Sequence, residues 1–444
     1  MHVFPQLRKL ELKYQNELAV IGVHSPKFPN ERDTDCIRMA IERYEVSHPV
    51  INDEQFEIWN SYACRAWPTL MFIDPLGKVV GKHEGEASFE ALDFLLTSMV
   101  EEFDSQNLLD RSLLDHRLDY SERETLSFPG KIVVDGKSDA IFISDSNHNR
   151  IIQTTLAGEL VQTIGGVTAG FQDGDFILAA FNHPQGMVLD GNFLYVADTE
   201  NHAIRMIDLS EQYVETVAGI GTQSSFGSVG GNSLKTPLNS PWDLELLGNF
   251  LYIAMAGCHQ IWALDLRDLQ VFPKIGSGRE DIIDGIYGLA ALAQTSGLAI
   301  DGDSLYFADS ETSSIRKADL GYGQNVTTIV GQGLFEFGDV DGVGSAVRLQ
   351  HPSGICWFEG SLYVTDTYNH KIKKVCPETK TTTTIFGSGH KGFNDGISEE
   401  ATFYEPSGLS AGNGKLFIAD TNNHAIRVAD LESGEVSTLK ITGL

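Results

Sequence analysis

The sequence predicts a multidomain chain in which an α/β sandwich over residues 1–104 is followed by an all-β, six-bladed propeller over residues 126–444. Helical and strand patterns alternate through the first part, as they do in layered α/β domains. Beyond it, one nine-residue string recurs six times at intervals of 53 to 57 residues. Four short apolar runs accompany each copy, which is typical of a repeated four-stranded unit.

The elements of the α/β part follow from its apolar periodicity. We expect helices at 3–14, 34–46, 54–64 and 88–103, strands at 18–24 and 48–53, and a strand hairpin at 69–85. Thr34 stands just before the second helical run and is its expected N-cap. The charged segment that follows carries a stripe of leucines and predicts a linker helix over 105–125.

The repeated string defines the propeller. Its six copies align without gaps and read SDSNHNRII, ADTENHAIR, AMAGCHQIW, ADSETSSIR, TDTYNHKIK and ADTNNHAIR. The second position of these strings is held by Asp145, Asp198, Met255, Asp309, Asp366 and Asp420. The second strand of each unit, for example LYVAD at 194–198, is apolar enough to indicate burial on both faces. A single blade cannot bury both faces, so we expect a closed ring of blades, each built from contiguous sequence without strand exchange.

The polar residues of the repeated string have a structural interpretation. An aspartate at the end of a strand can accept hydrogen bonds from backbone N–H groups of the turn. A histidine recurs at one blade position, as His202, His259, His370 and His424. Propeller symmetry would spread these four side chains around the ring, too far apart to share one metal ion. We therefore expect structural turns and neither a metal nor another cofactor.

The connections between blades are long and are expected to share one face with these turns. Most carry Asp-Gly near the middle, as at Asp173-Gly174, Asp284-Gly285, Asp341-Gly342 and Asp395-Gly396, whereas one has Gly230-Gly231. We interpret these pairs first as tight turns. Long loops on a rigid scaffold commonly carry binding residues, so a protein or peptide partner is expected at this long-loop face.

The composition of the chain limits the classes of partner it could bind and indicates its cellular compartment. The chain has 61 acidic and 32 basic side chains, hence 61 − 32 = 29 net negative charges at pH 7. This argues against partners that are nucleic acids or anionic membrane surfaces. The five cysteines are odd in number, widely spaced and never arranged as Cys-x-x-Cys, which favours a reducing, cytoplasmic location.

The recurring Asp-x-x-Asn-His-x-Ile-Arg string resembles the NHL repeat, which is named for its Asn-His pair. Six copies in register carry the resemblance over roughly 126–444. The third copy departs from it, with Met255 in place of the aspartate and Trp262 in place of the arginine. The fourth copy has Thr312-Ser313 in place of Asn-His, so these two turns must be held differently.

The N-terminal part resembles the thioredoxin fold. Trp67-Pro68-Thr69 stands before the strand LMFID, with Gly77 in the hairpin and Gly85 before the last helix. In that family the matching proline is cis and faces the active-site thiols. The resemblance thus implies a cis bond at Pro68, and it makes Trp67 and Pro68 the substrate-facing candidates, with the Trp67 backbone offered to a bound peptide.

The chain departs from that family where its chemistry would lie. The Cys-x-x-Cys motif and the central strand before it do not occur, and neither Cys36 nor Cys64 stands at a helix start beside a second cysteine. No catalytic residue is predicted. Either the chain starts late or the domain has become non-catalytic; we favour the former, because a missing central strand would leave an apolar gap in the sheet.

The pairing of the two parts resembles the family of NHL repeat-containing thioredoxin-like proteins. It implies a binding protein whose propeller recognises a protein or peptide and is coupled to a domain of thiol-disulfide oxidoreductase ancestry. One alternative is a propeller enzyme, a metal-dependent lyase or hydrolase. The predicted inner strands contain no histidine, and only His183 and His351 precede them near the channel mouth. The other alternative is a scaffold without chemistry.

Overall fold

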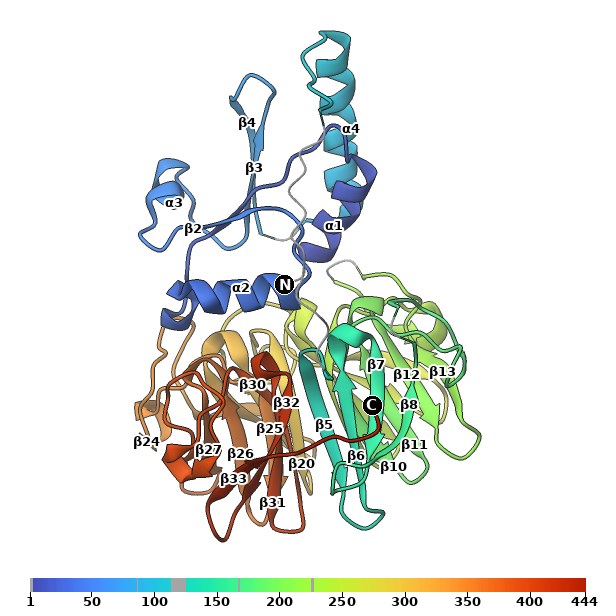
Figure 1. Ribbon diagram of the computed structural model, residues 1–444, viewed down its shortest axis with the longest axis vertical. Coiled ribbons are helices and arrows are strands. Elements are labelled where there is room, and N and C mark those ends of the chain that lie inside the picture. Colours follow the sequence, from blue (N-terminus) through green and yellow to red (C-terminus); the bar gives the residue numbers. More distant parts are fainter. Residues whose placement is uncertain (1–2, 86, 113–124, 167, 225–226) are drawn as a thin grey trace. The chain divides into compact units, whose positions relative to one another are not determined.

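The computed structural model describes all residues except 1–2, 86, 113–124, 167 and 225–226. The chain forms two compact units, residues 1–122 and 123–444 (Figure 1). None of the described helices is long and apolar enough to cross a membrane.

The N-terminal unit alternates helices and short strands as predicted. Its elements are α1 (Phe4–Lys13), β1 (Gly22–His24), α2 (Thr34–Arg43), β2 (Val50–Asn52), α3 (Glu57–Ser61), β3 (Thr69–Ile73), β4 (Val79–Glu84) and α4 (Phe89–Ser105), with a 3-10 turn at Pro29–Arg32. Strand β1 pairs with β2 in parallel, and β3 pairs with β4 as an antiparallel hairpin. A small core joins Leu10 and Tyr14 of α1 to Leu92 of α4.

One local prediction in this unit was wrong. The N-cap of α2 is Asp33, whose carboxylate accepts hydrogen bonds from the backbone N–H groups of Asp35 and Cys36, while Thr34 is already the first helical residue. The linker helix predicted over 105–125 falls mostly outside the described residues. Helix α4 ends at Ser105, and residues 106–112 form turn and coil.

The second unit is a six-bladed propeller in which each blade has four main antiparallel strands (Figure 1). The blades are, in order, β5 (Pro129–Asp135), β6 (Ala140–Asp145), β7 (Arg150–Thr154), β8 (Leu160–Ile164); β10 (Pro184–Asp190), β11 (Phe193–Asp198), β12 (Ala203–Asp208), β13 (Tyr213–Ala218); β15 (Pro241–Leu247), β16 (Phe250–Met255), β17 (Gln260–Asp265), β18 (Gln270–Ile275); β20 (Thr295–Asp301), β21 (Ser304–Asp309), β22 (Ser314–Asp319), β23 (Asn325–Val330); β25 (Gly354–Phe358), β26 (Ser361–Asp366), β27 (Lys371–Cys376), β28 (Thr381–Phe386); and β30 (Pro406–Gly412), β31 (Lys415–Asp420), β32 (Ala425–Asp430), β33 (Glu435–Thr438).

The apolar side chains of these strands pack between neighbouring blades. Strand β6 is buried along its whole length, as expected for a strand covered on both faces. Ile141 and Ile143 of this first blade share a core cluster with Phe417 and Ile426 of the last blade. This cluster closes the ring.

The connections add a fifth strand to five of the blades. Two-residue strands pair with the outer strand of the blade that follows; they are β9 (Gly174–Asp175), β14 (Gly231–Asn232), β19 (Gly285–Ile286), β24 (Gly342–Val343) and β29 (Gly396–Ile397). In the first blade, Thr442 near the C-terminus forms a parallel bridge with Glu159 instead. The four main strands of each blade come from contiguous sequence, as predicted, and this isolated bridge additionally joins the last residues to the first blade.

Candidate functional site

The repeated aspartates hold the blade turns together. In the second blade, Asp198 Oδ1 accepts the backbone N–H of Asn182 at 2.7 Å, and its Oδ2 accepts the side chain of Asn201 at 2.8 Å. Burial raises the pKa of Asp198 to about 6, while the charge of Arg205 acts in the opposite direction. Four other repeats place an aspartate carboxylate on a backbone N–H in the same way; these aspartates are Asp145, Asp309, Asp366 and Asp420.

In four of these blades a fully buried cation, arginine in three and lysine in one, connects the turn to the preceding connection. The Arg205 guanidinium lies 2.9 Å from Asp198 and 2.7 Å from Asp173, and it also donates to two backbone carbonyls. Arg316 and Arg427 repeat this arrangement, and Lys373 takes the place of the arginine in the fifth blade. The Asp-Gly pairs are therefore more than tight turns: the aspartate binds the buried cation, and the glycine begins the two-residue outer strand.

The third blade replaces this polar network with apolar packing. Met255 and Trp262 stand where the other blades have aspartate and arginine, and both are buried in one core cluster. The connection before this blade has Gly230-Gly231 and lacks the aspartate. The turn aspartate, the buried arginine and the connection aspartate are thus all replaced together in this blade. The replacement of one of them therefore leaves no buried charge of the other two without a partner.

The repeated histidines join each blade to the next. His202 Nδ1 accepts the backbone N–H of Ser240 at 3.1 Å, from the start of the third blade. The other copies use the same geometry, with acceptors at Asn149, His259, Ser313, His370 and His424 and N–H donors at His183, Gln294, His351, Glu405 and Phe128. Burial lowers the pKa of His259, which favours the neutral ring that this contact needs. Among the residues that the structure describes, no group of three or more His, Cys, Asp or Glu could hold a metal ion.

The sequence-predicted candidates Trp67 and Pro68 lie at the start of β3. Their peptide bond is cis, as expected from the sequence. The Trp67 indole N–H donates to the carbonyl of Ser25 at 2.8 Å, and its ring packs at 4.4 Å from that of Trp59. With 45% of its surface exposed, Trp67 still offers an aromatic face to solvent.

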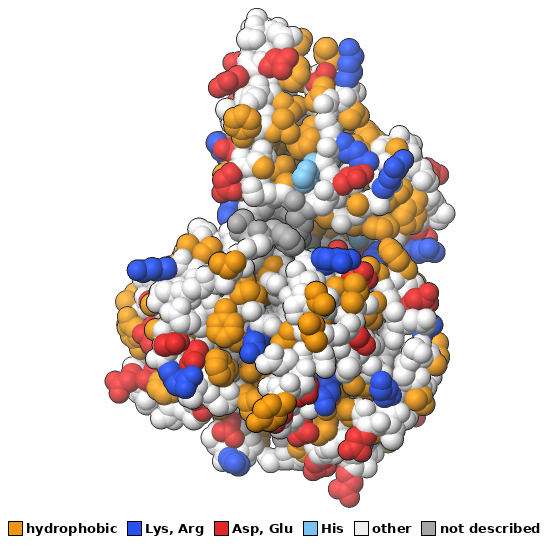
Figure 2. Space-filling view, turned by 180° about the vertical axis from the view of Figure 1, so that it is seen from behind, with side chains coloured by type: hydrophobic (Ala, Val, Ile, Leu, Met, Phe, Trp, Pro, Cys, Tyr) orange, Lys and Arg blue, Asp and Glu red, His pale blue; other side chains and the backbone are white. Residues whose placement is uncertain are grey.

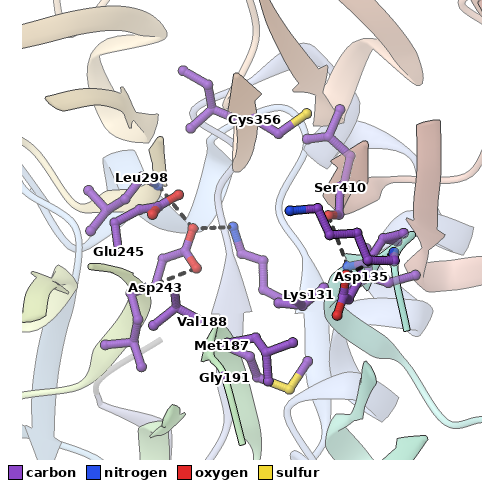
Figure 3. Close-up of a pocket in the computed structure, with 18 residues that line it drawn as sticks. Lys131, Asp135, Met187, Val188, Gly191, Asp243, Glu245, Leu298, Cys356 and Ser410 are labelled. Carbon is purple, nitrogen blue, oxygen red and sulfur yellow. Dashed lines mark hydrogen bonds and ion pairs between the residues drawn. The ribbon is translucent and has the colours of Figure 1, made fainter. Parts of the chain in front are cut away.

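The inner strands enclose a cavity of about 440 Å³ along the propeller axis. One end is closed by an ion pair between Lys131 of β5 and Asp243 of β15, at 3.3 Å (Figure 3). Lys131 Nζ also donates to the carbonyls of Ser296 and Ser353, at 2.8 and 2.7 Å, so that one ammonium group connects four blades. The other four inner strands carry glycine at this level, namely Gly186, Gly297, Gly354 and Gly408, each with neighbouring atoms where a side chain would begin.

Glu245 and Cys356 line the same cavity (Figure 3). Burial, with Asp243 nearby, raises the pKa of Glu245 to about 8. Burial and the charge of Glu245 raise the pKa of the Cys356 thiol to about 12, so this thiol is neutral and poorly nucleophilic near pH 7. These residues were not predicted from the sequence, in which the inner strands contain no histidine. The signal was present, because Lys131 and Asp243 interrupt a position that is otherwise glycine.

Comparisons with known proteins match this architecture. The NHL repeat family model matches residues 181–205 and 403–429. The chain is 45% identical to Protein SUPPRESSOR OF QUENCHING 1, chloroplastic, of Arabidopsis thaliana, over 100% of the chain and 44% of that protein. It is 41% identical to human NHL repeat-containing protein 2, over 99% of the chain and 66% of that protein. The chain therefore spans less than two thirds of the length of these relatives.

Among solved structures, a structural genomics protein of unknown function from Bacteroides thetaiotaomicron is 18% identical, with a TM-score of 0.46; the match covers 70% of this chain and 71% of that one. The two segments matched by the repeat model each contain a complete aspartate, Asn-His and arginine set. With six blades built on this set and its variants, the chain belongs to the NHL-repeat β-propeller proteins.

Proposed function

We propose that the protein binds a protein or peptide partner through the long-loop face of its propeller. The observation that carries this proposal is the position of exposed large apolar side chains. Figure 2 shows hydrophobic side chains at the surface in one view of the molecule. Thirteen of those exposed in the second unit lie on the blade connections: Phe171, Ile177, Leu178, Ile220, Val229, Leu234, Ile286, Leu289, Phe335, Val340, Val343, Phe393 and Ile397. Exposed apolar groups on the connections of a rigid scaffold are typical of protein interaction sites.

The connections that carry these side chains are held rigidly. Each of four connections is fastened by an aspartate to a buried cation of the following blade, as Asp284 is to Arg316 at 3.1 Å. Asp284 also accepts the backbone N–H and the hydroxyl of Thr328, both at 2.8 Å. Loops fixed before binding lose little conformational entropy on binding, so this arrangement favours a recognition surface.

We further propose that the N-terminal unit is a thioredoxin-like domain. Its order of elements, with a parallel strand pair, an antiparallel hairpin and a closing helix, supports this assignment. In the described part of the unit, β1 and β3 each pair with a single strand. Ile21, Val23 and Ile51 are exposed around the β1–β2 pair, which fits a sheet that accepts one more strand. Trp67 and Pro68 would then face the bound peptide.

The five cysteines are all free thiols, so the chain itself supplies no disulfide for exchange. We accordingly propose binding rather than thiol-disulfide chemistry as the activity of these residues. The cytoplasmic location stays a prediction from the cysteine pattern, and the Arabidopsis relative is named as chloroplastic. Neither the propeller enzyme nor the simple scaffold gains a specific observation in its favour.

Affinity capture with two matched variants tests the partner site. One variant carries Ile286→Ser, Leu289→Ser and Val343→Ser on the long connections. The control carries Phe193→Ser, which is exposed beside the hairpin turn between β10 and β11 and lies on none of the long connections. Proteins captured by the wild type and the control, and lost with the first variant, would support the proposal. Identical capture by all three folded proteins would contradict it.

A further inference from the structure

The axial cavity opens away from the long-loop face. Its lining begins at the level of Lys131 and Asp243 and extends along the inner strands to Lys137 and Gly191, which are exposed in the hairpin turns. No residue before Lys131 on β5 contributes to the lining. The cavity is thus a blind pocket whose mouth lies on the face opposite to the one proposed for partner binding.

The Lys131 ammonium at the closed end has no N–H donor left for a ligand. The Lys131 ammonium has three N–H donors, and it uses them on Asp243 and on the two carbonyls of Ser296 and Ser353. Asp243 Oδ2 also accepts the N–H of Leu298 at 2.9 Å, and its Oδ1 accepts the N–H of Leu244 at 3.0 Å. These two groups close the channel and neutralise each other.

Glu245 is an acidic residue of the cavity lining that takes no part in the ion pair between Lys131 and Asp243. It lies two residues after Asp243 on β15, and its side chain lines the cavity (Figure 3). Within the described part of the chain, the structure shows no ion pair to it. The ionisable lining groups other than cysteine are Lys131, Lys137, Asp135, Asp243 and Glu245, two positive and three negative, which leaves one net negative charge when all are ionised.

We propose that this pocket binds an alkylammonium group, with the carboxylate of Glu245 as its counter-ion. The volume of about 440 Å³ suits a small organic ligand. Val188, Leu244, Leu298 and Ile355 supply apolar wall for the alkyl part. Without a cation, Glu245 keeps its proton at neutral pH; with a cation beside it, the ionised form is favoured. Ligand binding near pH 7 therefore releases a proton.

Calorimetry on the full chain tests the site with n-butylammonium as probe and n-butanol and butyrate as neutral and anionic controls. We expect n-butylammonium to bind and n-butanol and butyrate not to bind. Binding of the cation should release about one proton at pH 7, measured from the difference in binding enthalpy between phosphate and MOPS buffers, neither of which contains a primary amine. Glu245→Gln keeps the shape of the side chain and should weaken binding by about tenfold or more and abolish the proton release. The control Glu215→Gln, on the exposed side of β13, should change neither quantity.

A second probe distinguishes two sources of the ammonium group. The peptide Gly-Gly-Lys-Gly-Gly binding more tightly than n-butylammonium would assign the site to a lysine side chain, whereas weaker binding would assign it to a free amine. Both results support the proposal if they depend on Glu245. Equal binding of butanol, unchanged binding in Glu245→Gln, or no binding of either cation would overturn it. These outcomes are independent of the long-loop face, because the pocket opens on the other side.

Discussion

His424 Nδ1 of the last blade accepts the backbone N–H of Phe128 of the first blade at 3.1 Å, across 296 positions of sequence. The Phe128 ring also packs edge-on against the His424 imidazole, with 4.3 Å between ring centroids. This pair is the ring-closing copy of a contact that joins every blade to its neighbour. The residue that names the NHL repeat therefore acts here as a connection between blades.

Replacing His424 with alanine should lower the free energy of unfolding by about 1–3 kcal/mol, because the buried N–H of Phe128 would lose its acceptor. His424→Asn should retain most of the stability. Asn149 already makes the same contact in the first blade, at 3.0 Å from His183, and asparagine tolerates the left-handed backbone found at His424 (φ 52°). Urea unfolding of both variants checks the prediction, and equal losses would contradict the acceptor role.

Removing Asp198 should be more damaging, because the fully buried charge of Arg205 would lose its fully buried counter-ion and keep only the partly exposed Asp173. We expect Asp198→Ala to lower the free energy of unfolding by about 3–5 kcal/mol. The third blade suggests a rescue. The triple variant Asp198→Met, Arg205→Trp and Asp173→Gly introduces the residues that the third blade has at these three positions. In thermal and urea unfolding, this triple variant should be clearly more stable than Asp198→Ala. If the triple variant is no more stable than Asp198→Ala, the two solutions are not interchangeable.

The blades and their strands could be predicted because each repeat carries its own local signals, such as the apolar LYVAD run and the Asn-His turn. The contact between Arg205 and Asp173 could not, because the ring brings these two residues together. A signal was nevertheless available. The arginine or lysine follows the Asp-Gly aspartate by 32 positions in four blades, and both are lost together in the third blade.

The channel residues were missed for a different reason. Lys131 and Asp243 come from blades 112 positions apart, and nothing local to either strand shows that they meet on the axis. Predictions that depended on repeat-local chemistry therefore fared better than those that depended on contacts between distant segments.

The raised pKa of Glu245 predicts how stability depends on pH. The ordinary pKa of glutamate, 4.5, applies to the unfolded chain, and about 8 applies to the folded protein. Between these values the folded protein binds more protons at this site than the unfolded chain, so the contribution of Glu245 to stability is lost as pH rises. Glu245→Gln should therefore unfold at higher urea than the wild type above pH 8, and the difference should shrink towards pH 4.5. A difference that is constant with pH would contradict this assignment.

The N-terminal unit should not reduce insulin disulfides. That reaction needs an accessible thiolate and a second thiol within reach to resolve the mixed disulfide. Cys36 is buried in α2, where its thiol donates to Asn30 Oδ1 at 3.4 Å, while Cys64 follows α3 and is partly exposed. A turbidity assay with the 444-residue chain should show no turnover beside a dithiol reductase as positive control. Turnover that disappears in Cys36→Ser or Cys64→Ser, but persists in a Cys376→Ser control, would show that these two thiols act as a functional pair despite lying on different elements.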